Sequence, residues 1–325
     1  MDSCAHCVTV SPLPQDSSFA ERGNGQAIGS ISTPGFYSLP KPQPGEPTHI
    51  INGGMGGEFY TAHFDPAKEK LFNLSSRSFH VGGSWGVAGQ AETDGSILHI
   101  GWSSGPGGRA GPGIAMMSAV KVLSYDQATA SLVGNPAGWY SKMHNGTLAD
   151  EPLLKLGTMG DTRVYTPSLP KGTHGAASDL TLHLELLPAG DASNVAVALE
   201  IKVLATGAAT GNATSIMINI TSTAGAGGTG AGAGVRKGII SVTPSFAVRR
   251  SHGQAFDVLA GESSVDLRVL TDRSIIEAFA MGGRASQTEH DYPAEGDSAF
   301  HLINWGVAPL VVRNLSIASM ACGWV

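Results

Sequence analysis

The sequence has little charge and little cysteine, and it contains no long apolar run. Only 14% of its 325 residues are charged, and the net charge of −6 includes no cluster of Lys and Arg. Binding to nucleic-acid phosphates depends on such clusters, so we expect no nucleic-acid partner. No stretch of 18 or more apolar residues occurs, and we therefore expect no membrane-spanning helix.

The three cysteines, Cys4, Cys7 and Cys322, are too few to form a disulfide framework. Cys4 and Cys7 form a CxxC pair, but a redox motif should open a helix after a strand, and a zinc site needs a second Cys/His pair. The pair lies instead in a Ser/Pro/Gly-rich segment, which we interpret as an unstructured tail. We expect no metal and no cofactor.

Five of the ten asparagines stand in N-x-S/T sequons, where Ser and Thr content would give roughly one or two by chance. The candidate glycosylation sites are Asn73, Asn145, Asn212, Asn219 and Asn314. They favour a secreted or vacuolar location for the full-length protein. Residues 1–20, however, have neither a basic start nor an apolar core, so they do not form a signal peptide.

Glycine is abundant, with 44 residues, and it separates short β-rich runs. Three of these runs alternate apolar and polar residues strictly, which is typical of antiparallel sheets that cover a core on one face. They are Leu180 to Leu186, Val195 to Val203 and Ile216 to Ile220. The sequence therefore predicts an all-β protein with a C-terminal β-sandwich, in which an Ala/Gly-rich loop occupies residues 221–238.

Residues 265–293 carry the most specific pattern in the chain. Alternation and an Asp-Arg-Ser turn predict a β-hairpin there. The segment DRSIIEAF, followed by GGR and then YP, also resembles the D-x-S-x-x-E-x-F…GR…YP signature of the C-terminal sandwich in glycoside hydrolase family 32, the invertase and fructanase family. The matching positions are Asp272, Ser274, Glu277, Phe279, Gly283, Arg284, Tyr292 and Pro293. The resemblance implies that these are structural residues of the sandwich.

The resemblance extends upstream in the order of the family. Glu58 to Phe72 is similar to the end of the fourth blade of the family's five-bladed propeller, and Ile97 to Trp102 is similar to part of the fifth blade. The segment SAVKVLSYD, which begins at Ser118, is similar to the segment that ends the propeller. The resemblance implies a partial propeller over 49–127 (the end of blade four and blade five) and a sandwich over 128–325. Residues 1–48, which are rich in Ser, Pro and Gly and show no helix or strand signal, are expected to form a disordered or extended lead-in. In SAVKVLSYD, Val120 and Lys121 replace the Pro and Arg of the family.

The catalytic motifs of the family are missing from this sequence. A retaining glycosidase needs two carboxyl groups about 5 Å apart, which the family takes from WMNDPNG and EC motifs, and it binds sugar through an RDP motif. None of the three is present, so the resemblance implies no catalytic residue here. Trp102 remains the one candidate for stacking against a sugar, although a tryptophan in a blade core is the more common role.

Two other groups of acidic residues invite a functional interpretation. Asp272 and Glu277 are not a catalytic pair in the family, and their hairpin position favours hydrogen bonds to turn amides. Glu289, His290 and Asp291 are adjacent on a strand, so their side chains point to opposite faces and we interpret them as solvated.

Three hypotheses about function remain open. The chain is the C-terminal part of a β-fructofuranosidase-like enzyme, acting on sucrose or fructans in its full-length form and truncated in nature or by its gene model. Alternatively, it is a non-catalytic module that binds carbohydrate or a partner subunit. The third is a structural remnant with neither activity. Because one blade cannot close a propeller, we expect residues 49–127 to be poorly ordered or packed on the sandwich.

Overall fold

The computed structural model describes residues 35–40, 42–52, 58–68, 70–72, 79–80, 85–90, 96–103, 116–168, 176–186, 197–206, 213–222, 236–245 and 253–321. In these residues the secondary structure consists of β-strands and two short 3-10 helices, η2 (Gly138–Met143) and η3 (Met281–Gly283). The predicted all-β class is confirmed. Within the same residues, no helix combines the length and the hydropathy that crossing a bilayer requires.

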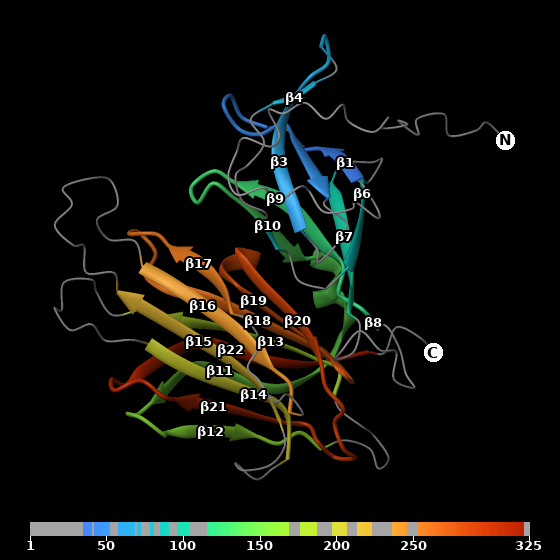
Figure 1. Ribbon diagram of the computed structural model, residues 1–325. Coiled ribbons are helices and arrows are strands. Elements are labelled where there is room, and N and C mark those ends of the chain that lie inside the picture. The colour runs from blue at the N-terminus through green and yellow to red at the C-terminus, as the bar shows by residue number, and fades with distance from the viewer. Residues whose placement is uncertain are drawn as a thin grey trace.

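The N-terminal part forms two small antiparallel sheets, which lie above the rest of the molecule in Figure 1. The first sheet has the order β1-β2-β3-β4 with β5 paired to β3, and the second has the order β10-β9-β7-β6 with β8 paired to β7. The strands of the first are β1 (Gly35–Ser38), β2 (His49–Asn52), β3 (Glu58–Asp65), β4 (Lys70–Phe72) and β5 (Phe79–His80). The strands of the second are β6 (Trp85–Gln90), β7 (Ile97–Ser103), β8 (Met116–Met117), β9 (Lys121–Asp126) and β10 (Ser131–Pro136).

A small core holds these two sheets together. Its buried apolar members come from both sheets: Leu39, Ile50, Phe59, Ile97, Leu123 and Leu132. The Phe59 ring meets the buried His99 ring edge-on, with centroids 5.2 Å apart. Burial lowers the pKa of His99 to about 3, so this imidazole is neutral inside the core.

The boundaries of the N-terminal part differ from the predicted ones at both ends. β1 lies inside the segment 1–48, where no strand was expected, because its backbone pairs with β2. β10 lies inside the predicted sandwich, but it pairs with β9 across a tight turn and therefore belongs to the second N-terminal sheet. Sequence alternation alone does not reveal which neighbouring strand a given strand will join.

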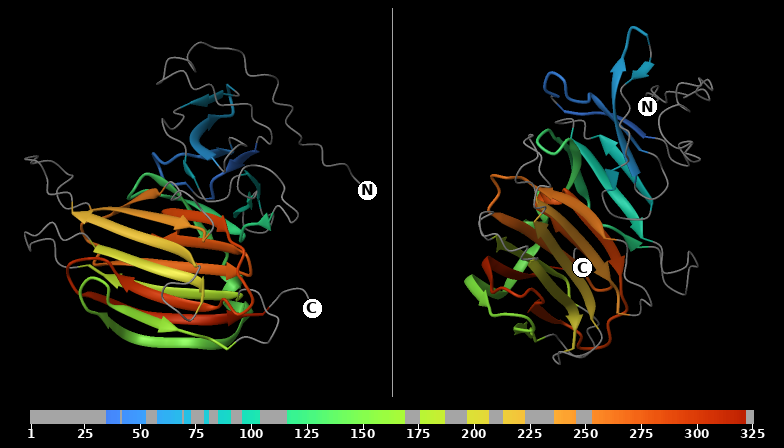
Figure 2. Two further views of the ribbon diagram at one scale, coloured as in Figure 1. Left: turned by 60° about the horizontal axis from the view of Figure 1, so that its bottom comes forward. Right: turned by 60° about the vertical axis from the view of Figure 1, so that its left-hand side comes forward.

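The C-terminal part is a β-sandwich of two six-stranded antiparallel sheets (Figure 2). We call them the inner sheet, which faces the N-terminal part, and the outer sheet. The inner sheet, in spatial order, consists of β11 (His144–Leu156), β22 (Leu310–Met320), β13 (Ser178–Glu185), β18 (Ser264–Asp272), β19 (Ile275–Ala280) and β20 (Ala285–His290). The outer sheet consists of β12 (Thr162–Tyr165), β21 (Ala299–Asn304), β14 (Val197–Ala205), β15 (Thr214–Ser222), β16 (Arg236–Thr243) and β17 (Gln254–Val258).

The alternation predicted for these strands is the one that the structure shows. Leu180, Leu182 and Leu184 of β13 lie in one continuous core with Ile216, Ile218 and Ile220 of β15. The predicted sandwich is thus confirmed. The Ala/Gly-rich segment is shorter than 221–238, because Thr221 and Ser222 still pair with the first residues of β16, and the rest of it lies outside the described residues, as do Cys4, Cys7 and Cys322.

Candidate functional site at the junction of the two parts

The family-like signature runs from the end of β18 through β19 and η3 to the loop that follows β20. All six residues of β19 are buried. Ile276, Ala278 and Ala280 point into the sandwich core, so the alternation places Glu277 and Phe279 on the opposite face of the sheet. That face is covered by the second N-terminal sheet, and both faces of β19 are therefore out of water.

Glu277 joins the two parts of the molecule through a buried ion pair. Its Oε1 lies 3.0 Å from Lys121 Nζ, and the two side chains are 2% and 0% exposed. Its Oε2 accepts a hydrogen bond from the backbone amide of Ala119, and Thr288 Oγ1 donates to Oε1 over 2.8 Å. Lys121 Nζ also lies 5.7 Å from the centre of the Phe279 ring. Every polar atom of this carboxylate is thus engaged.

Glu277 accepts a hydrogen bond from a backbone amide, as its hairpin position favoured, but that amide does not lie in a turn of the hairpin. The amide that it binds belongs to Ala119, 158 residues earlier in the chain. The physical reason is the pleat, which points Glu277 away from its own turn and across the junction. A carboxylate that holds an ammonium and an amide at once is a structural group, and the exposed Asp272 at the tip of the hairpin does not join it.

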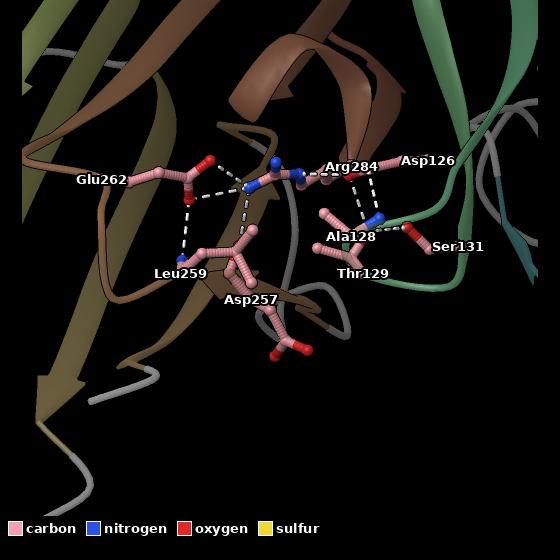
Figure 3. Close-up of polar contacts among 8 residues, drawn as sticks. All are labelled: Asp126, Ala128, Thr129, Ser131, Asp257, Leu259, Glu262 and Arg284. Carbon is pink, nitrogen blue, oxygen red and sulfur yellow. Dashed lines mark hydrogen bonds and ion pairs between the residues drawn. The ribbon is translucent and has the colours of Figure 1, made fainter. Parts of the chain in front are cut away.

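Arg284 forms a second connection across the junction (Figure 3). Its Nε donates to Asp126 Oδ2 over 2.8 Å, and its Nη1 donates to Glu262 over 2.8 Å. Asp126, at the end of β9, also accepts hydrogen bonds from Thr129 Oγ1 and the Ala128 amide. The guanidinium therefore ties a turn of the second N-terminal sheet to the loop that precedes β18.

Hydrogen bonding and burial shift the pKa values of Asp126 and Arg284 in opposite directions. Burial alone would raise the pKa of Asp126, but hydrogen bonds from Thr129 and Arg284 outweigh it and lower the pKa. Burial would likewise lower the pKa of Arg284, and its bonds to Glu262 and Asp126 outweigh burial and raise it. Both groups are charged at neutral pH, so the connection is an ion pair there.

Gly283 lets the backbones of the two parts approach each other. It has φ 93°, and a Cβ at this position would lie 2.3 Å from the carbonyl oxygen of Gly134 in β10. Any other residue would combine a left-handed backbone with a clash against backbone atoms. The glycine of the signature is thus required by a direct contact between η3 and β10.

The remaining signature residues lie away from the junction. Asp272 and Ser274 form the hairpin turn between β18 and β19, in which Arg273 has φ 57°. Tyr292 is 60% exposed and its ring meets the His290 ring edge-on at 5.7 Å, while Pro293 follows it in the loop before β21. The structure therefore brings Glu277, Phe279, Gly283 and Arg284 together and leaves the other four outside this group.

The expectation that residues 289–291 are solvated is wrong. His290 and Asp291 are buried, because β20 has β16 near one face and β7 near the other. Asp291 accepts hydrogen bonds from the hydroxyl groups of Thr214 and Ser245 and from the Ser245 amide. Burial raises the pKa of Glu289 to about 7. Within the described residues, no three metal-ligating side chains cluster.

Sequence reasoning missed the partners on the N-terminal side. Lys121 looked like a departure from the family, yet its positive charge is what the buried Glu277 requires. Tyr140 of η2 accepts a hydrogen bond from the Val120 amide over 2.8 Å and braces the same segment. The resemblance of SAVKVLSYD was the available signal, since it contains both Lys121 and Asp126.

The structure leaves the predicted sugar contacts and glycosylation sites as predictions. Trp102 pairs with Trp85 in the second N-terminal sheet, but its side chain is outside the described ones. Asn145 and Asn314 are exposed, and Asn219 is half-buried in β15. Asn73 and Asn212 lie outside the described residues.

Comparisons with known proteins agree with this architecture. A family profile described as "Glycosyl hydrolases family 32 C terminal" matches residues 157–319, which include most of the sandwich. A 6(G)-fructosyltransferase from Asparagus officinalis is 52% identical over 48 residues, which are 15% of this chain and 8% of that protein. A bifunctional fructosyltransferase from Allium cepa is 50% identical over a stretch of the same length.

Two solved structures share the fold over nearly the whole chain. Fructan 1-exohydrolase IIa from Cichorium intybus has a TM-score of 0.66 at 17% identity, with 88% of this chain and 61% of that chain covered. Exo-inulinase from Aspergillus awamori has a TM-score of 0.56 at 16% identity, with 90% and 57% covered. The chain thus spans less than two thirds of the proteins that it resembles. The profile covers half of its residues, and the chain belongs to glycoside hydrolase family 32 through the C-terminal domain of that family.

Proposed function

We propose that this chain is the C-terminal part of an enzyme that acts on sucrose or fructans, and that alone it is a scaffold without catalytic activity. The observation that carries the proposal is the junction. Among the residues that the structure describes there, the fully buried carboxylate is that of Glu277, which is held by Lys121 and the Ala119 amide. It is therefore unavailable as a nucleophile or acid/base, and the sequence lacks the motifs that supply these groups in the family.

The substrate class rests on the relatives. The Asparagus and Allium proteins are named as fructosyltransferases, and the Cichorium enzyme has been crystallised with 1-kestose. In a retaining mechanism, a fructosyl group moves from the substrate to a carboxylate and then to water or to another sugar. The full-length protein would carry out one of these transfers, and the sequons of this chain support a secreted or vacuolar location for it.

The test is an assay of the purified chain with sucrose, 1-kestose and inulin. We expect no release of glucose or fructose and no longer oligosaccharide. A full-length family member assayed in parallel controls for the substrates, and a circular dichroism spectrum with a β signature controls for folding. Turnover by this chain that persists in a Glu277→Gln variant would contradict the scaffold function.

The second candidate is a carbohydrate-binding module. It is favoured by the sandwich core, which is continuous and independent of the N-terminal sheets. Retention of the folded chain on an inulin column, without hydrolysis and with release by free fructan, would favour this candidate over a scaffold. If the folded chain passes through the inulin column without being retained, the carbohydrate-binding function is contradicted.

A further inference from the structure

The outer sheet of the sandwich exposes large apolar side chains on the face that points away from the core. Trp305 is 44% exposed and Ile239 is 45% exposed. Core residues such as Leu199 and Ile218 occupy the alternate positions on their strands, so the pleat assigns Ala198 and Asn219 to the exposed face. Large apolar side chains exposed on one face of a sheet can mark a site of contact with another group.

The indole of Trp305 is fixed in orientation. Its Nε1 donates to Glu200 Oε2 over 2.8 Å. Glu200 is 8% exposed, and its other oxygen accepts a hydrogen bond from Ser215 Oγ over 2.5 Å. The carboxylate of Glu200 thus fixes the orientation of the ring, while nearly half of the Trp305 surface stays exposed to water. A rigid, partly exposed indole can pack against the apolar C–H face of a sugar at little entropic cost.

A glycosylation sequon lies in the same row of the sheet. The Trp305 amide donates to the Ala198 carbonyl group, and Ala198 is paired with Asn219 across β14 and β15. The order across the face is therefore Trp305, Ala198, Asn219, with Ile239 as the next neighbour in β16. Strands are about 4.8 Å apart, so Asn219 and Trp305 are separated by about 10 Å over an alanine.

We propose that Asn219 carries an N-linked glycan whose first sugar lies over Ala198 and packs against the Trp305 ring. In the modification, the Asn219 side-chain nitrogen attacks the anomeric carbon of a polyprenyl-pyrophosphate-linked oligosaccharide. The new C–N bond replaces the C–O bond to phosphate, the amide loses one proton, and the polyprenyl pyrophosphate leaves. The glycan shields an apolar patch that the sandwich leaves in water. The proposal is independent of the enzymatic function proposed above.

The other described sequons have no such platform. Asn145 accepts a hydrogen bond from Ser319 Oγ over 2.6 Å at one end of the inner sheet. Asn314 is exposed at a position with φ 50° in β22. Neither has Trp305 or another exposed tryptophan as a neighbour across its sheet. Asn219 therefore differs from them in having a fixed aromatic surface within the reach of one sugar.

The experiment uses the full chain, secreted from a glycosylating host behind an added leader. Enzymatic deglycosylation in H₂¹⁸O labels every asparagine that carried a glycan, and we expect the label at position 219. Thr221→Ala should abolish that label, while Thr221→Ser keeps both the sequon and the label. Oxidation of tryptophans, followed by mass spectrometry, should be at least about threefold slower at Trp305 before deglycosylation than after it. Trp139, also 44% exposed, is the internal reference and should not change.

Two results would overturn the proposal. The first is an unlabelled position 219 in the secreted protein. The second is a labelled position with equal oxidation of Trp305 before and after deglycosylation. Asn314→Gln, which removes a sequon on the other sheet, should leave the oxidation of Trp305 unchanged.

Discussion

The sandwich and the N-terminal sheets are stabilised in different ways. The sandwich encloses one core of thirty-one buried apolar residues between its two sheets, whereas the described N-terminal sheets share a core of six. Burial of apolar area is the dominant stabilising contribution to a fold. The core of the sandwich can therefore stabilise the sandwich by itself, whereas the N-terminal sheets depend on the polar contacts of the junction. Four variants test this difference.

The largest effect is expected from Lys121→Met. It leaves the carboxylate of Glu277 buried beside a neutral side chain, and breaking a buried ion pair in this way costs about 3–5 kcal/mol. The free energy of unfolding from urea titrations measures the loss. The double variant Lys121→Met, Glu277→Leu removes both charges and should recover most of it. Equal stability of the single and double variants would show that the ion pair does not anchor the N-terminal sheets.

Gly283→Ala should cost at least about 2 kcal/mol, because it adds a methyl group against the Gly134 carbonyl group at a left-handed backbone position. Gly261→Ala is the matched control, since a Cβ at Gly261 meets nothing within 4 Å. Thermal unfolding of both variants distinguishes them. If Gly283→Ala unfolds at the temperature of the control, η3 and β10 do not approach as closely as described.

Glu289 should make the stability of the sandwich depend on pH. Burial raises its pKa from 4.5 to about 7, so between these values the folded protein holds a proton that the unfolded chain has released. The contribution is complete below about pH 4.5 and is lost as the pH rises through 7, on the order of 3 kcal/mol in total. Glu289→Gln should remove the dependence. Glu295→Gln, at an exposed position, should retain it.

The smallest effect is expected from Arg284→Lys. A lysine keeps the charge but cannot reach Asp126 and Glu262 with two planar donors at once, at a cost of about 1 kcal/mol. Limited proteolysis should cut the wild-type chain within residues 49–127 before it cuts after residue 150, and should cut the variant there about fivefold faster. Equal cleavage rates in the two parts of the wild-type chain would contradict the difference in stability.

The sequence predicted the parts of the fold that depend on local pattern. Period-2 alternation identified β13, β14 and β15, and a turn of Asp272 to Ser274 identified the hairpin. The alternation did not predict which sheet β10 joins, because strand pairing depends on residues that alternation does not specify. It also placed Asp291 in water, because alternation assumes one solvated face, whereas β20 is covered on both.

From the sequence, the candidate site was predictable only on the side of the sandwich. The signature identified Glu277, Gly283 and Arg284, each of which makes a contact across the junction. Its chemistry became clear only with Lys121 and Asp126, which lie more than 150 residues away along the chain. No spacing rule connects such positions. The fixed indole of Trp305 was likewise invisible, because Glu200 is on a strand that is not adjacent to it in sequence.

The long separation between Ala119 and Glu277 has a consequence for synthesis on the ribosome. The N-terminal sheets emerge well before the residue that anchors them, and β11, the first strand of the sandwich, must wait for β22, the last, to form its ladder. Contacts so distant in sequence form slowly and expose unpaired strands meanwhile. The inner sheet of this chain therefore forms only after β22 has been translated, and a ribosome that stalls after β19 would release a chain in which β11 and β13 still lack the strand that joins them.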